Sequence, residues 1–151
     1  MSRRTRAAVL VALLSLFACA PALEPSAREG ERRVTLLAFS DLHSRLLRSA
    51  GDPGLGALAA CLTAEAATAD HPVFVLDAGD LVEGGILFPR FGGEPELRAA
   101  ALLGVDAQAL GNHDQQLGPG AGAELRRRLG VSPPLAANLP GGVPFRVLDR
   151  D

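Results

Sequence analysis

Residues 73–80 read Val-Phe-Val-Leu-Asp-Ala-Gly-Asp, an apolar run that gives way at once to acidic residues and a glycine. A short apolar run with β-branched residues predicts a buried strand over 73–76. His71-Pro72 separates it from the preceding helical pattern, and the glycines and prolines of 84–93 predict a loop after it. The stretch therefore predicts a strand that carries polar residues, Asp80 among them, at its carboxyl end.

The same arrangement recurs on both sides of this stretch. Apolar runs predict further strands over 34–40, 105–110 and 135–138, with a fifth beginning at 145–148. Segments with apolar residues at helical spacing predict helices over 55–69, 94–103 and 121–129. This alternation predicts an α/β fold with a mostly parallel central sheet and right-handed crossovers. Ligands of such sheets bind outside the carboxyl ends of the strands.

Three polar motifs follow three of the predicted strands: Asp41-Leu42-His43, Gly79-Asp80 and Gly111-Asn112-His113-Asp114. Asp41 and His43 are two residues apart, so both side chains leave the same side of an extended backbone and could bind one metal ion. Asp80 adds a carboxylate that could bridge two ions, and Asn112 adds an amide oxygen. Each motif alone is equally well explained by a solvated turn. Together at one sheet edge they predict a metal centre whose mixed ligands suit Mn, Fe or Zn.

The ordered set resembles the calcineurin-like metallophosphoesterase superfamily, and most closely the N-terminal catalytic domain of bacterial 5′-nucleotidases. Those enzymes carry Asp-x-His, then Gly-Asp, then Gly-Asn-His-Glu/Asp. The similarity runs from Val34 to about Leu148 and includes residues 76–84, 103–114 and 136–139. The resemblance implies part of a metallophosphoesterase-type α/β-β/α sandwich, truncated within its sheet.

The resemblance also implies roles for the motif residues. Asp41 and His43 would hold the first of two divalent ions, Asp80 would bridge both, and Asn112 would hold the second. His113 would be the catalytic imidazole that stabilises the transition state or protonates the leaving oxygen. In the nucleotidases an acid three positions after this His fixes its tautomer, but this chain has Gln116 there. Asp114 could take that catalytic role only through a different geometry.

The family's later ligands are histidine-containing motifs from a second half of the domain, and this chain has no His after His113. Residues 33–151 are therefore expected to form only the N-terminal part of the domain, with a missing C-terminal half as a partner. Negligible turnover is expected of such a chain alone, together with an open sheet edge and an uncovered apolar face. His71 precedes a strand, at the end opposite the motifs, and is predicted to be a surface residue outside the site.

The first residues are typical of a targeting segment. Arg3, Arg4 and Arg6 precede an apolar run over 7–18, which is short of the roughly 20 residues that span a bilayer. Leu16-Phe17-Ala18-Cys19 resembles a bacterial lipobox, which implies a signal peptide over 1–18, a lipid anchor on Cys19 and a tether over 19–32. Simple cleavage after Ala18 or Ala20, and a buried helix, are the alternatives. The predicted location is the bacterial cell envelope, as a periplasmic or outer-membrane lipoprotein.

The amino-acid composition narrows the class of substrate and partner. The 151 residues suffice for one domain, and all fifteen basic residues are Arg. Three of them lie within 1–18, where there is no acid, so the remainder has 12 Arg against 17 acids and a formal charge of −5. This charge argues against a nucleic-acid polymer as partner and leaves a small phosphorylated substrate such as a nucleotide. The lone Cys61 is predicted to be a small core residue.

The sequence therefore predicts an exported metal-dependent phosphoesterase of the 5′-nucleotidase type. Two alternatives stay open. One is a catalytically inactive lipoprotein fragment that serves as a binding or surface module. The other lies within the family and is a thiosulfate-ester hydrolase or a capsule-related homologue.

Overall fold

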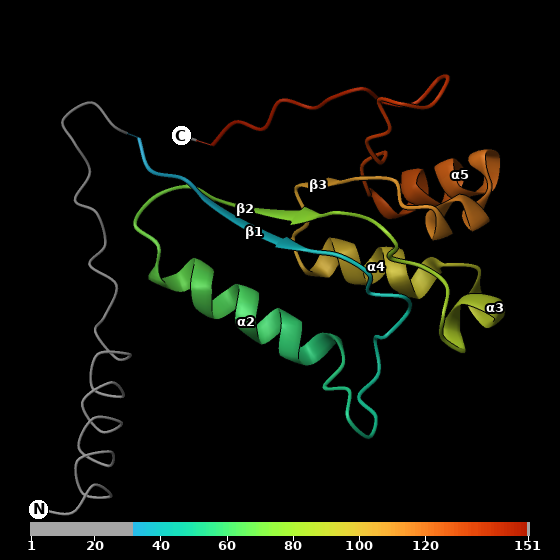
Figure 1. The fold of residues 1–151 in the computed structure, drawn as a ribbon, viewed down its shortest axis with the longest axis horizontal. Coiled ribbons are helices and arrows are strands. Elements are labelled where there is room, and N and C mark those ends of the chain that lie inside the picture. Colours follow the sequence, from blue (N-terminus) through green and yellow to red (C-terminus); the bar gives the residue numbers. More distant parts are fainter. Residues whose placement is uncertain (1–31, 151) are drawn as a thin grey trace, which may run out of the picture. The chain divides into compact units, whose positions relative to one another are not determined.

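The computed structural model describes residues 32–150, so the predicted signal peptide, Cys19 and nearly all of the tether lie outside the described residues. Three strands form its sheet: β1 (Thr35–Phe39), β2 (Val73–Asp77) and β3 (Ala107–Gln108). They are parallel and lie in the order β1-β2-β3 (Figure 1). Leu37 pairs with Val75 and Leu76 pairs with Ala107. The predicted α/β fold with a parallel sheet is confirmed.

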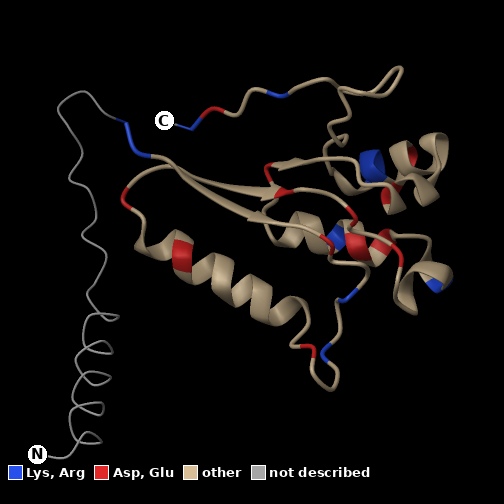
Figure 2. Cartoon of the chain, viewed as in Figure 1, with Lys and Arg blue, Asp and Glu red and all other residues tan. Residues whose placement is uncertain are grey.

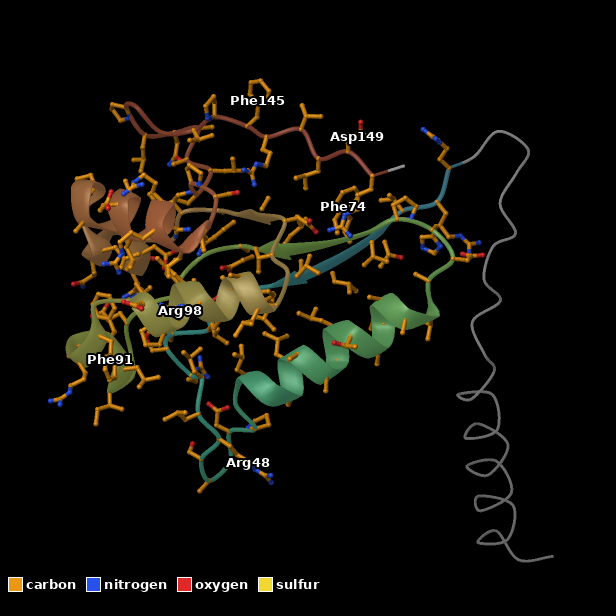
Figure 3. All side chains as sticks on the ribbon, turned by 180° about the vertical axis from the view of Figure 1, so that it is seen from behind. Arg48, Phe74, Phe91, Arg98, Phe145 and Asp149 are labelled. Carbon is orange, nitrogen blue, oxygen red and sulfur yellow. The ribbon has the colours of Figure 1, made fainter. Side chains whose placement is uncertain are left out.

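The three predicted helices are present as α2 (Leu55–Thr68), α4 (Glu94–Leu102) and α5 (Pro119–Leu129). Two acidic residues stand in the first turn of α4, where they favour the positive end of the helix dipole. Gly130 ends α5 in the left-handed conformation. Figures 1 and 3 show α2 and α4 on one side of the strands, with the segment after α5 running back along the other side.

The structure corrects the predicted loop over 84–93, which contains the short helix α3 (Leu87–Phe91). Phe88 packs against the hydrophobic core, and Gly92 in a left-handed conformation ends the helix. Pro89 lies in the first turn, where a helix needs no N–H donor. The last two residues of the third motif begin a 3₁₀ helix, η1 (His113–Leu117).

The later strands are shorter than predicted. The strand expected over 105–110 is reduced to Ala107–Gln108. The one expected over 135–138 survives only as single bridges from Leu135 to Ala109 and to Val143, and residues 145–148 form no strand. Prolines flank both segments and remove backbone donors that a ladder needs.

The hydrophobic core lies directly beneath the polar motifs. Leu81 and Val82 follow Asp80 in the chain, are fully buried, and pack with Leu97 and Ala100 of α4. The prediction that Cys61 lies in the core is wrong, because Cys61 is exposed. Only Leu62 of α2 is buried, since most of this Ala-rich helix faces away from the sheet.

The other side of the sheet is partly covered by the chain's last residues. Figure 3 shows Asp149 close to Phe74 of β2. Arg150 lies over the ring of Phe74, 5.2 Å from its centroid, and Arg146 Nη1 donates to the backbone oxygen of Asp106 at 3.0 Å. Leu36 of β1 nevertheless stays 60% exposed. Part of the apolar sheet surface is therefore uncovered, as expected. Among residues 32–150 no helix has the length and apolarity needed to cross a bilayer.

Candidate metal centre

The first two motifs are joined by backbone hydrogen bonds that continue beyond the strand ends. The N–H of Asp41 donates to the oxygen of Gly79 at 3.0 Å, and the N–H of His43 donates to the oxygen of Asp80 at 3.0 Å. Ser44 donates to Leu81 in the same way, at 3.1 Å. The turns after β1 and β2 therefore run side by side, which carries the ring of His43 to the carboxylate of Asp80.

The third motif reaches this place because two glycines let the turns touch. A Cβ on Gly79 would lie 2.7 Å from the nitrogen of Gly111, and one on Gly111 would lie 2.2 Å from the nitrogen of Asp80. Gly79 also has φ 108°, which side-chain-bearing residues rarely adopt. The resulting contact lets the N–H of His113 donate to Asp80 Oδ1 at 2.9 Å.

Left-handed backbone is concentrated in these turns. Asp41, His43, Ser44, Asp80 and Glu83 have φ between 45° and 66°, and they are all the non-glycine residues with positive φ in the described part of the chain. Each such residue costs about 1–2 kcal/mol relative to right-handed backbone. Clustering of this kind is typical of functional sites, where surrounding contacts hold the chain in a disfavoured shape.

Hydrogen bonds to Asp114 help to keep these turns in their left-handed conformation. Asp114 is buried, and its two carboxylate oxygens accept hydrogen bonds from four backbone N–H groups at 2.9–3.2 Å, those of Gly111, Asp80, Leu81 and Val82. The carboxylate thus ties the turn after β2 to the turn after β3. The structure shows Asp114 as a link between backbones, and the catalytic role that the sequence allowed it only through a different geometry stays a prediction.

The acid at the ring of His113 is Glu83, which the sequence analysis missed. Glu83 Oε2 is paired with Nδ1 of His113, and this bond raises the pKa of His113 above the usual value of an imidazole. Gln116, where the resemblance places the acid, is exposed on η1. A sequence signal did exist, since Glu83 is the one charged residue between the buried pair Leu81-Val82 and the glycines that follow.

The ligand atoms of His43, Asp80 and His113 lie within 4.8 Å of one another. The two imidazole rings meet edge to face, with centroids 4.8 Å apart. Around a tetrahedral ion the ligand atoms would be about 3.3 Å apart, so binding needs a modest contraction. The imidazole of His43 together with the carboxylates of Asp41 and Asp80 suits Zn, Mn or Fe, and the residues present therefore fit the expected metal.

The remaining predicted ligands lie at the margin of this cluster. Asp41 Oδ1 is 3.6 Å from His43 Nε2, and its side chain is mostly exposed. Asn112 is exposed and immediately precedes η1. The structure thus brings Asp41, His43, Asp80 and His113 together and places Asn112 beside them in the chain.

His71 lies elsewhere, at the amino ends of β1 and β2. Its Nε2 is 2.7 Å from Thr35 Oγ1 and its Nδ1 is 2.7 Å from Asp70 Oδ1. It is therefore outside the centre, as predicted. Its side chain is partly buried, with 16% of its surface exposed, and it contacts the exposed carboxylate of Asp70.

Comparison with known proteins agrees with this geometry. The family of the calcineurin-like phosphoesterases matches residues 34–146. A 5′-nucleotidase from Bos taurus is 34% identical over 111 residues, which cover 67% of this chain and 19% of that protein. A 5′-nucleotidase from Homo sapiens is 32% identical over 134 residues, 82% of this chain and 23% of that protein.

Solved structures give the same result. The NAD nucleotidase of Haemophilus influenzae superposes with a TM-score of 0.59 at 26% identity, over 70% of this chain and 20% of that one. A 5′-nucleotidase precursor from Thermus thermophilus gives 0.56 at 29% identity, over 70% and 22%. The chain thus spans about a fifth of the length of these proteins. On its motifs, its fold and these similarities, the chain belongs to the calcineurin-like phosphoesterase family and is a hydrolase by family.

Proposed function

We propose that this chain is the N-terminal part of an exported phosphoesterase that hydrolyses nucleotides or related phosphate esters with two divalent metal ions. The observation that carries the proposal is the meeting of His43, Asp80 and His113 at the carboxyl edge of a parallel sheet. The 5′-nucleotidases among its relatives support a small phosphorylated substrate.

The residues divide into ligands and groups that act on the substrate. Asp41 and His43 would hold the first ion, Asp80 would hold both, and Asn112 would hold the second. When bound, the pair of ions supplies an activated water and a positive clamp for the phosphoryl oxygens. That local charge is needed because the Arg residues of the described chain are interspersed with acidic ones (Figure 2), and the run Arg126 to Arg128 lies in the last turn of α5, away from the three motifs in the sequence.

The task of His113 is to hold a proton next to the phosphoryl group. Glu83 occupies its Nδ1, so Nε2 is the nitrogen left to act on the substrate. The raised pKa keeps the ring protonated closer to neutral pH, which suits an imidazole that donates a proton to the leaving oxygen. Asp114 keeps the two turns in register while this happens.

Metal binding is the first test. We expect calorimetric titration of the chain with Zn²⁺ or Mn²⁺ to show tight binding that Asp80→Asn reduces at least tenfold. His71→Gln is the matched control, because it removes an imidazole with a carboxylate neighbour at the other end of the strands. Equal binding by Asp80→Asn and the unchanged chain would refute the assignment of the centre.

Phosphate chemistry is the second test. The metal-loaded chain should bind inorganic phosphate, and Asp80→Asn should not bind it under the same conditions. Hydrolysis of p-nitrophenyl phosphate with Mn²⁺ should be negligible for this chain alone, and robust activity that Asp80→Ala removes would overturn that expectation. Tight metal binding without any phosphate affinity would favour the alternative, a binding or surface module without phosphoesterase chemistry.

Export and lipidation belong to the same proposal and rest on residues 1–19, outside the described part. Mass spectrometry of the protein made in a bacterial host should find a mature chain that begins at a lipid-modified Cys19. A mature chain that begins after Ala18 or Ala20 without lipid would leave export intact and refute the anchor.

A further inference from the structure

One residue of the centre touches both of its imidazoles. The carboxylate of Glu83 pairs with Nδ1 of His113, and the backbone oxygen of Glu83 lies 3.3 Å from Nδ1 of His43. The two rings come from different turns, one after β1 and one in η1. Glu83 is thus a shared point of attachment for side chains that are 70 positions apart in the sequence.

The backbone at this position favours glycine, not glutamate. Glu83 has φ 66°, and the next residue, Gly84, has φ 103°. A Cβ on Gly84 would lie 3.1 Å from the Cβ and the backbone oxygen of His43, so this turn packs directly on His43. Glycine would adopt this left-handed conformation without strain, whereas glutamate does so at a cost. The presence of glutamate here therefore indicates that its side chain has a function.

A carboxylate oxygen of Glu83 faces His113 and its backbone oxygen faces His43, and both oxygens are acceptors. They therefore decide which ring nitrogen of each imidazole carries the proton. A carboxylate and a carbonyl oxygen each require an N–H from the ring they contact. A neutral imidazole that gives its proton to Nδ1 has a bare Nε2, which is the atom that can bind a metal or accept a proton. In His43 this Nε2 faces Asp41 Oδ1, at 3.6 Å.

We propose that Glu83 is a positioning residue that holds both imidazoles with Nδ1 as the donor and Nε2 without a proton. It holds His113 through its carboxylate and His43 through its backbone oxygen. Glu83 takes the place that the resemblance gives to an acid at position 116. The catalytic meaning of this arrangement rests on the proposed function, but the arrangement itself does not need metal or substrate.

Nuclear magnetic resonance of the three histidine rings tests the proposal on the full ¹⁵N-labelled, metal-free chain. Spectra are recorded at about pH 9, where an ordinary imidazole is neutral, and His113 is assigned from a His113→Asn spectrum. We expect the wild-type ring of His113 to carry its proton on Nδ1. In Glu83→Gly the proton should move to Nε2, the form that free imidazole side chains prefer in water, so the two nitrogen signals exchange ranges.

Controls separate this role from a merely structural one. Glu83→Gly suits the left-handed turn and keeps the backbone oxygen, so the signals of His43 should not move. Glu83→Gln keeps an acceptor and should retain the wild-type form of His113, and Gln116→Ala should leave every ring unchanged. An unchanged His113 in Glu83→Gly, or an equal effect of Gln116→Ala, would overturn the proposal. These outcomes are independent of phosphate binding, so this inference and the proposed function fail separately.

Discussion

Asp77 should make the protein more stable in mild acid than at neutral pH, and Asp77→Asn should remove that dependence. The side chain stands at the end of β2 and is only 2% exposed. Oδ1 accepts a hydrogen bond from the N–H of Gly79 at 2.9 Å, while Oδ2 has no partner among the described residues. Burial, with a smaller contribution from the charge of Asp114, raises the pKa of Asp77 from 3.8 to about 6.

The sign and size follow from that shift. The folded state binds the proton more tightly than the unfolded state, so the free energy of unfolding falls as pH rises from about 4 to about 6. A shift of about two units corresponds to about 3 kcal/mol, lost in full above pH 7. Asn is uncharged and keeps the acceptor for Gly79. Asp77→Asn should therefore unfold with a free energy about 1–3 kcal/mol higher than wild type at pH 8, and with little difference at pH 4.

Urea unfolding followed by circular dichroism, in the presence of a chelator, measures both values. The difference between variant and wild type at each pH cancels the titration of the other carboxylates. Glu65→Gln, which changes an exposed acid on α2, is the matched control and should show no such difference at either pH. If Asp77→Asn is less stable than wild type at pH 8, or if the gain is the same at pH 4 and pH 8, the reasoning from burial is wrong.

Three further outcomes follow from the contacts of the centre. Gly111→Ala should lower the free energy of unfolding by about 3 kcal/mol in urea and abolish Zn²⁺ binding in calorimetry, because its Cβ would lie 2.2 Å from the nitrogen of Asp80. Asp114→Asn should cost about 3 kcal/mol by the same urea measurement, since an amide turns an NH₂ group toward backbone donors. Glu124→Gln should cost far less, because the interaction it weakens is an exposed ion pair with Arg127. Leu36→Gln should leave the melting temperature almost unchanged and reduce self-association in analytical ultracentrifugation, because Leu36 is 60% exposed on the uncovered sheet surface. A large drop in melting temperature would show that this surface is packed in solution.

The parts of the fold that sequence predicted well are those with strong local patterns. The run 73–76 is apolar and ends in Asp-Ala-Gly-Asp, and β2 extends over Val73–Asp77. The strands at the edge of the sheet were harder to predict. The strand expected over 135–138 needs hydrogen bonds to neighbouring strands, and Pro133 and Pro134, which precede it, have no N–H to donate. α3 was missed because a single helical turn that contains a proline has no periodicity to detect.

The candidate site divides in the same way. The positions of His43 and Asp80 follow from strand ends, which a local pattern reveals. The role of Glu83 depends on a left-handed turn and on a contact with His113, 30 positions away, and no local rule contains either. For the same reason the link that Asp114 makes could not be predicted, because its four backbone donors come from two turns that meet only in the folded chain.

Several of the chain's acidic residues are concentrated at the candidate metal centre. Asp41, Asp80, Glu83 and Asp114 lie in or next to it, and the nearby Arg45 donates to the backbone oxygen of Asp41, not to a carboxylate. Charges of one sign at this density repel unless cations or N–H groups offset them. Backbone N–H groups donate hydrogen bonds to Asp114, and His113 pairs with Glu83. The carboxylate of Asp41 and part of that of Asp80 therefore remain for divalent cations. The same carboxylates that would repel a phosphate ester thus become, under the proposed function, the ligands of the ions that attract it.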